Sequence, residues 1–311
     1  IFFAEIENDL RRVLAYSLNN QLGFMVVGIG VGTELALNGT ASHAFAHILY
    51  KSLLFMSVGA VLFRTGTSKA SELGGLYKTM PITAMCCLVG AASISAFPLF
   101  SGFVTKSLIT DATASEHYPF IWLILVFASA GVLSHSGIKI PYFTFFAHDS
   151  GQRPKEAPLN MLFAMVITSA LCIYIGVSPD YLYDLLPFEV VYVPYTVSHV
   201  LSQLQLLFFA LLAFAILMRT GIHPPEIRAV NLDFDWTYRY FIPRLIKKYW
   251  IVFSAYYEIS GKFAISKLKV LQTRISVIFS PTSVLAGAVP GSFTVIWIVI
   301  ILSGALLVVL F

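Results

Sequence analysis

Charged residues are scarce in this chain. Only 12% of its 311 residues are Asp, Glu, Lys or Arg, whereas these types make up about a quarter of a typical soluble domain. Hydrophobic residues account for 58%. This balance excludes an ordinary soluble protein and predicts an all-α polytopic membrane protein in a lipid bilayer. We expect no nucleic-acid partner, and the net charge of +4 indicates little until the charges are placed.

The sequence also lacks the motifs of cofactor enzymes. Its three cysteines, Cys86, Cys87 and Cys172, lie in apolar runs without metal-binding spacing, so we interpret them as packing residues. There is no phosphate-binding glycine loop, dinucleotide fingerprint or iron–sulfur cysteine cluster. His43 and His47 have the spacing of a metal-binding pair, but no Glu follows the first and Lys51 follows the second. We therefore expect no cofactor and no metal.

The first residues, "IFFAEIENDL", contain no initiator Met and no signal peptide. They read as if they began inside a helix. We expect the chain to be the C-terminal part of a longer protein.

Long apolar runs predict about seven transmembrane spans, since a helix needs about 20 apolar residues to cross a bilayer. The predicted spans are residues 13–32, 40–63, 80–112, 118–145, 158–179, 197–219 and 289–311.

One of these runs, 80–112, is too long for one plain helix. It contains "SAFPLFSGF", with Pro98 and Gly102 near its middle. Proline removes a backbone donor and glycine frees the backbone, so we predict a discontinuous helix broken near 97–103. Such breaks persist at membrane depth only inside protein or along a wet cavity.

The charges of the connecting loops predict an orientation. If every run crosses once, loops 33–39, 113–117 and 180–196 share one side and contain no Lys or Arg. The other side collects basic residues, and the positive-inside rule makes it cytoplasmic. The chain is thus predicted to span the inner (cytoplasmic) membrane, with its C-terminus outside. The basic residues are Arg11, Arg12, Arg64, Lys69, Lys78, Arg153, Lys155 and those of 222–275.

Residues 220–288 differ from the rest. They open with a Pro-Pro turn and then mix charged residues with aromatic and aliphatic ones. This pattern predicts an amphipathic helix at the cytoplasmic membrane interface, the alternative being a linker of short helices. We therefore divide the chain into a transmembrane module at 1–219, a cytoplasmic-side amphipathic segment at 220–288 and a C-terminal transmembrane helix at 289–311.

Buried basic residues carry the functional prediction. His43, His47 and Lys51 lie at i, i+4 and i+8, and therefore on one face of a predicted transmembrane helix. Charge at this depth costs ~2.5–3.5 kcal/mol even on lenient scales. Lysine protonation responds to nearby charge, and histidine both donates and accepts near neutral pH. The pattern therefore favours a proton relay over a purely structural role.

Three further residues extend the candidate site. Lys106 lies just after the predicted break, where free backbone groups can hold water. His135 extends the path or forms a hydrogen bond to a neighbouring helix. Lys139 either belongs to the same path or extends its ammonium to the cytoplasmic interface.

Four ordered motifs resemble the antiporter-like subunits of respiratory complex I and of Mrp-type multisubunit cation/proton antiporters. They are "NDLRRVLAYSLNNQLGFM", "HAFAHILYKSLLFMSVGAV", "ELGGLYKTMP" and "ISAFPLFSGFVTKSLI". Two later stretches, "PYFTFFAHDSGQRPKEAPLNMLFAM" and "LDFDWTYRYF", are similar to the D-type branch of the Mrp subunits.

The resemblance implies a fold of two inverted repeats, each with a broken helix, of which this chain would hold most of the second. It also implies that His43, His47 and Lys51 form a central hydrophilic axis and that Lys106 serves the outer half-channel. Arg11 replaces a lysine that is frequent in the family. Because arginine keeps its charge, we do not count Arg11 as a relay residue.

Three functions fit these observations. The first is a proton-translocating subunit of an Mrp-type antiporter, with other membrane subunits as partners and protons, with sodium or potassium, as cargo. The second is the same module in an NADH–quinone oxidoreductase or hydrogenase-type redox complex. The third is a structural membrane subunit without transport of its own. A transporter subunit is favoured over an enzyme.

Overall fold

The computed structural model describes residues 1–222, 226–227, 231, 234–278, 280 and 291–310. It divides into two compact units, residues 1–231 and 232–311, which are treated separately below. In the described residues the only strand-like pairing is an isolated bridge between Asp9 and Lys69. The prediction of an all-α membrane fold with one discontinuous helix is confirmed.

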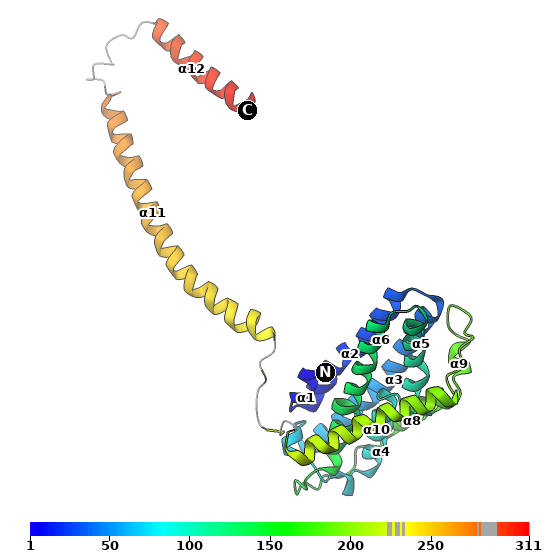
Figure 1. Cartoon of the computed structure of the whole chain (residues 1–311). Helices are drawn as coiled ribbons and strands as arrows, with labels where there is room; N and C mark the ends of the chain where they lie inside the picture. Colours follow the sequence, from blue (N-terminus) through cyan, green and yellow to red (C-terminus); the bar gives the residue numbers. More distant parts are fainter. Residues whose placement is uncertain (223–225, 228–230, 232–233, 279, 281–290, 311) are drawn as a thin grey trace. The chain divides into compact units, whose positions relative to one another are not determined.

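The first unit is a bundle of helices (Figure 1). Its elements are α1 (Phe2–Ile6), α2 (Leu10–Val31), α3 (Glu34–Thr65), η1 (Ala70–Glu72), η2 (Leu76–Lys78), α4 (Pro81–Ile94), α5 (Ser101–Ser115), α6 (Pro119–Val132), η3 (Leu133–Ile138), α7 (Lys139–Pro141), η4 (Tyr142–Phe146), α8 (Leu159–Val177), α9 (Asp180–Tyr183) and α10 (Val197–Thr220).

Four continuous helical stretches of this unit are long and apolar enough to cross a membrane. They are Glu34–Thr65, Pro119–Phe146, Leu159–Val177 and Val197–Thr220, and each matches a predicted run. The run at 13–32 forms α2, which holds Arg11 and Arg12 in its first turn and Gln21 near its middle, and α2 is not among the four. The total of seven spans stays a prediction.

The long run 80–112 forms two helices, α4 and α5, as the Pro98 and Gly102 pattern predicts. The helices are separated by residues 95–100, slightly before the predicted position. Within this break Ala96 and Leu99 have positive φ values of 57° and 73°, a conformation that non-glycine residues rarely adopt. Gly102 is required at the start of α5, because an added Cβ would lie 1.9 Å from the Ser93 carbonyl oxygen.

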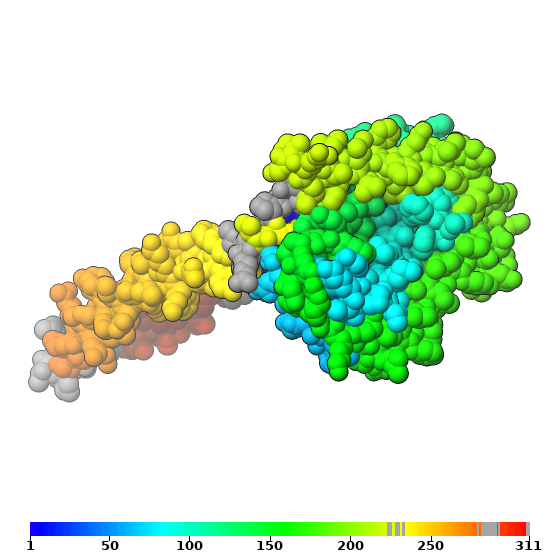
Figure 2. All heavy atoms as spheres, turned by 90° about the horizontal axis from the view of Figure 1, so that it is seen from below, coloured from blue at the N-terminus to red at the C-terminus, as the bar shows by residue number. Residues whose placement is uncertain are grey.

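Helix α3 is the centre of the bundle. It packs most extensively against α5, α2, α4 and α8, and its middle residues are buried. Its ends are set by local sequence: the Thr33 hydroxyl accepts from the Ala36 amide, and Gly66 ends the helix in a left-handed conformation. Close packing on α5 depends on Gly39, whose added Cβ would approach Ile109 to 2.8 Å. Helix α10 lies on the outside of the bundle (Figure 2).

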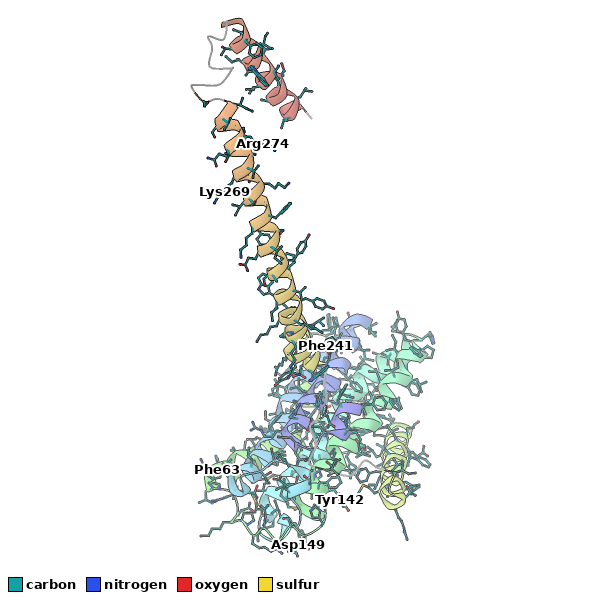
Figure 3. All side chains as sticks on the ribbon, turned by 90° about the vertical axis from the view of Figure 1, so that its left-hand side faces the viewer. Phe63, Tyr142, Asp149, Phe241, Lys269 and Arg274 are labelled. Carbon is teal, nitrogen blue, oxygen red and sulfur yellow. The ribbon has the colours of Figure 1, made fainter. Side chains whose placement is uncertain are left out.

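The loops of the first unit gather at two ends of the bundle (Figure 1). At one end, here called the acidic end, one cavity is lined by residues 32–35, Asp111, Glu189, Val191 and Tyr192. At the other, here called the basic end, the backbones of Asp9 and Lys69 form the isolated bridge, and Lys78 forms an ion pair with Asp149; Figure 3 labels Asp149 there. Hydrogen bonds from Arg153 and then Lys78 hold the pKa of Asp149 well below its usual range.

The second unit contains η5 (Thr237–Phe241), the long helix α11 (Ile242–Ile278) and α12 (Gly291–Leu310). Side chains project from all sides of α11 and none of them is buried (Figure 3). A long helix at 250–280 agrees with the predicted amphipathic pattern, while its place at a membrane interface stays a prediction. The start of the predicted span 289–311 lies outside the described residues, and α12 forms most of the remainder.

Candidate functional site

The three polar residues predicted to share a face of α3 are all buried. His43, His47 and Lys51 retain 0%, 7% and 4% of their exposure. The i, i+4, i+8 spacing places them in one line along the helix, about 6 Å apart per step. Because α3 is central, this line faces the packed interior formed by α2, α5 and α8.

His43 is held by side chains of two neighbouring helices. Its Nδ1 lies 3.0 Å from the Thr105 hydroxyl of α5, and its Nε2 lies 3.2 Å from Gln21 Oε1 of α2. The Tyr50 hydroxyl donates to the same Gln21 oxygen at 3.1 Å. Because the Gln21 amide oxygen only accepts hydrogen bonds, Nε2 of the neutral ring carries the hydrogen, and Nδ1 beside the Thr105 hydroxyl is the position that can take up a proton.

His47 and Lys51 continue the line with fewer contacts. The His47 ring lies 6.4 Å from the His43 ring and 5.5 Å from the Tyr50 ring, measured between centroids. Within the described part of the chain, His47 Nε2 and Lys51 Nζ are buried and have no hydrogen-bond partner. Buried polar groups of this kind normally have a hydrogen-bond partner, such as an ordered water.

Lys106 is positioned by the break. Its ammonium donates to the carbonyl oxygen of Ile94, the last residue of α4, at 2.8 Å. This carbonyl is free because the helix ends there, and the negative end of a helix dipole stabilises a cation. The ammonium also lies 5.2 Å from the centre of the Phe24 ring. The Phe24 ring and the Thr105 hydroxyl are in turn neighbours of the His43 ring.

The structure thus brings four predicted residues together in one buried series. The order is Lys106, His43, His47 and Lys51, with Thr105 next to Lys106 in sequence. In the described residues neither lysine forms an ion pair. The series extends from the break between α4 and α5 to the middle of α3. Each of its four side chains can bind and release a proton.

His135 and Lys139 lie in the next helical segment. His135 is fully buried, its Nδ1 contacts the Ser136 hydroxyl at 2.7 Å, and this hydroxyl donates to Ser17 of α2. Its Nε2 has no partner among the described residues, so a role in the path stays a prediction.

Lys139 is fully buried and differently placed. Its ammonium donates to the carbonyl oxygens of Glu5 and Glu7 and pairs with the Glu226 carboxylate at 2.8 Å. This environment satisfies the charge and favours an anchoring role over proton transfer. The sequence pattern did not indicate Glu226, which lies in the segment expected to form a cytoplasmic linker.

Sequence reasoning also missed Gln21, Tyr50 and Thr105. Gln21 and Tyr50 lie in apolar stretches, and their polarity within a predicted span was the only available signal.

Arg11 is exposed at the first turn of α2. Among the described residues, no group of three His, Cys, Asp or Glu gathers where it could hold a metal ion.

Comparison with known proteins finds similar sequences and similar solved structures. Residues 2–133 match the family described as "NADH:quinone oxidoreductase/Mrp antiporter, TM". The D-type Na(+)/H(+) antiporter subunit of Alkalihalophilus pseudofirmus is 33% identical over 179 residues, covering 55% of this chain and 35% of that protein. Hydrogenase-4 component B of Escherichia coli is 30% identical over 205 residues, covering 58% of this chain and 30% of the relative.

A solved structure has the same fold. A chain of the membrane-bound sulfane sulfur reductase, an archaeal respiratory membrane complex, covers 97% of this chain and matches with 53% of its own length, with a TM-score of 0.57 and 24% identity.

The chain spans well under half the length of the two curated relatives. The matched segment nevertheless contains His43, His47, Lys51 and Lys106. Residues 2–133 therefore resemble the antiporter-like transmembrane subunits of NADH:quinone oxidoreductases and Mrp antiporters, as the motifs of the sequence predict.

Proposed function

We propose that this chain is a proton-translocating membrane subunit of an Mrp-type multisubunit monovalent cation/proton antiporter, and that protons move through the buried series Lys106, His43, His47 and Lys51. Other membrane subunits are its partners in this proposal. The observation that carries it is the absence of a compensating carboxylate: in the described residues, two buried lysines and two buried histidines follow one another without an ion pair.

A purely structural site would be built differently. Lys139 is the example within this chain, because its buried ammonium has two carbonyl acceptors and a carboxylate. Lys51 has no acceptor among the described residues. A buried charge without partners is costly, and a group that gives up and regains its proton during transport accounts for its presence.

The test replaces Lys51 in two ways, in the assembled complex. Lys51→Arg keeps the positive charge but cannot release its proton at physiological pH. Lys51→Met keeps the approximate length and removes both charge and proton. We expect both variants to assemble and both to lose proton transport, measured in vesicles and normalised to assembled complex.

The other outcomes assign other functions. If Arg works and Met fails, the charge has a structural role. If Met works, the site is a packing site, because Met removes the ~2.5–3.5 kcal/mol insertion cost of a buried ammonium. A useful matched control is Lys262→Met in α11, which removes an exposed lysine.

A second assignment is to a redox-driven complex. It is supported by the solved chain of a sulfane sulfur reductase, whose fold match extends over 97% of this chain. Isolation of the intact complex through a tag on this chain distinguishes the two assignments. Co-purifying iron–sulfur or nucleotide-binding subunits favour the redox complex, and their absence from a complex that exchanges sodium or potassium for protons favours the antiporter.

A further inference from the structure

A polar cavity adjoins Lys106 at the acidic end of the bundle. Its volume is about 350 Å³, and it is lined by side chains of α5, α6, α10 and the loop between α9 and α10. On α5 the lining residues are Ser107, Thr110, Asp111 and Ala114, which begin directly after Lys106. A second cavity of about 700 Å³ shares Asp111 and Tyr192 with the first.

Thr110, one of the residues that line the cavity, lies one helical turn after Lys106 in α5. Thr110 lies four residues after Lys106 on the same face of α5, ~6 Å further along the helix. Its hydroxyl donates to the Lys106 and Ser107 carbonyl oxygens at 3.2 and 3.1 Å. The cavity wall thus begins at Ser107, the residue after Lys106, and continues with Thr110 one turn further along α5.

His199 is the histidine of this wall. It lies in the first turn of α10, half-buried, and its ring stacks on Phe103 with centroids 4.5 Å apart and planes 16° apart. Its Nδ1 lies 2.7 Å from the Pro194 carbonyl oxygen. Because a carbonyl only accepts, Nδ1 carries the hydrogen, and Nε2 is the basic position of the neutral ring.

We propose that His199 is the terminal proton-transfer residue at the acidic end, accepting protons that leave Lys106 through this cavity and releasing them to the adjoining second cavity. The inference rests on the proposed proton transport. In one transfer, a proton leaves the Lys106 ammonium, passes along water or hydroxyl oxygens, and binds His199 Nε2. The resulting imidazolium returns to neutral by losing one proton to water.

The charged and titratable groups around His199 favour this role. Asp111 lines the same cavity from α5, and Tyr192 does so from the loop before α10. Tyr195 of that loop contacts Phe103, on which His199 stacks. Tyrosine stays neutral in the range where histidine titrates.

The test removes the proton site and keeps the local hydrogen bond. In His199→Asn the side-chain amide can still donate to the Pro194 carbonyl but cannot take up a proton. His199→Glu restores a titratable group that ionises at lower pH. The matched control is His117→Asn, since His117 is exposed in the turn between α5 and α6, has a φ of 55° that asparagine tolerates, and does not line the cavity.

Proton transport is measured in vesicles of the assembled complex while the pH at the acidic end is varied from about 5 to 8, where histidine titrates. A positioned acid–base group contributes about 10²–10⁴-fold, and water can replace part of this, so we expect at least a tenfold loss in His199→Asn. The wild-type rate should show an inflection in this pH range. The inflection should be absent in His199→Asn and should lie at lower pH in His199→Glu. The His117→Asn rate and profile should equal the wild type.

A normal rate and profile in His199→Asn would overturn the inference. Equal losses in His199→Asn and His199→Glu with an unchanged pH profile would also overturn it, because they indicate a packing role. Lys106→Met, measured in parallel, separates the two proposals. Wild-type transport in Lys106→Met rejects proton transport through the buried series, whereas an inactive Lys106→Met beside a normal His199→Asn rejects only the role of His199.

Discussion

At the level of single residues, Lys139 and Glu226 form the most completely buried ion pair in the described part of the chain. Their side chains retain 0% and 7% of their exposure. Removal of one partner from a buried pair leaves a charge without compensation and costs ~3–5 kcal/mol. We therefore expect Lys139→Met or Glu226→Gln alone to lower the apparent temperature of thermal unfolding of the purified complex.

The double variant is the informative control for this pair. Because replacement of both members of a buried pair by uncharged groups is frequently neutral, Lys139→Met with Glu226→Gln should recover part of the loss. Breaking the exposed Glu258–Lys262 pair of α11 should have almost no effect, ~0–1 kcal/mol. Additive losses in the double variant would contradict a direct pairing.

The residue scale also marks the limit of sequence reasoning. The spacing of His43, His47 and Lys51 was sufficient to predict a shared buried face, because helix periodicity is a local property. The Gln21 and Thr105 contacts of His43 cross between helices, and the Lys139–Glu226 pair joins distant segments. Such contacts depend on how the helices pack, and no local pattern specifies them.

At the level of elements, the break between α4 and α5 depends on close backbone approach. An added Cβ at Gly102 would lie 1.9 Å from the Ser93 carbonyl oxygen, so Gly102→Ala must separate the two helix ends. The Ile94 carbonyl that holds Lys106 then moves. Misplacement of a reacting group by about 1 Å can cost up to about a hundredfold, and we expect proton transport to fall by tenfold or more.

The matched control is a glycine of α3 that faces open space. An added Cβ at Gly59 meets nothing within 4 Å, so Gly59→Ala should leave transport unchanged. Similar transport in Gly102→Ala and the wild type, at equal assembly, would show that the helix ends tolerate separation. The sequence predicted this break because proline and glycine act locally, whereas the positive φ values of Ala96 and Leu99 were not predictable from their side chains.

The loops of the basic end provide a second prediction at this scale. Asp149 accepts hydrogen bonds from Arg153 at 2.6 and 2.8 Å and from Lys78 at 2.8 Å. Since the pKa of Asp149 is lowered in the folded protein, its stabilising effect is present above the unfolded pKa and is lost only as pH falls through the lower, folded value. The protection of this loop from proteolysis should thus be constant between about pH 5 and 8.

Limited proteolysis measures this effect. In Asp149→Asn, trypsin cleavage after Lys78 should become faster at neutral pH, because the carboxylate no longer holds this side chain. Removal of a neighbouring exposed charge, Lys155→Gln, is the control and should leave the cleavage rate after Lys78 unchanged. Equal rates in Asp149→Asn and the wild type would mean that the exposed cluster does not order the loop.

At the scale of the whole molecule, the sidedness of the chain follows from where its charges gather. The described loops at the acidic end contribute Glu34, Asp111 and Glu189 to one cavity, while Lys69 and Lys78 lie at the basic end. From the positive-inside rule we expect the basic end to be cytoplasmic. The three native cysteines are buried, so single exposed cysteines can report the side. Tyr181→Cys should react with a membrane-impermeant maleimide from outside, and Lys155→Cys and Lys262→Cys from the cytoplasmic side. Labelling of Tyr181→Cys and Lys155→Cys from the same side would reject the alternation of spans. Labelling of Tyr181→Cys from the cytoplasmic side and of Lys155→Cys from outside would reverse the orientation, and with it the direction across the membrane in which protons pass from Lys106 to His199.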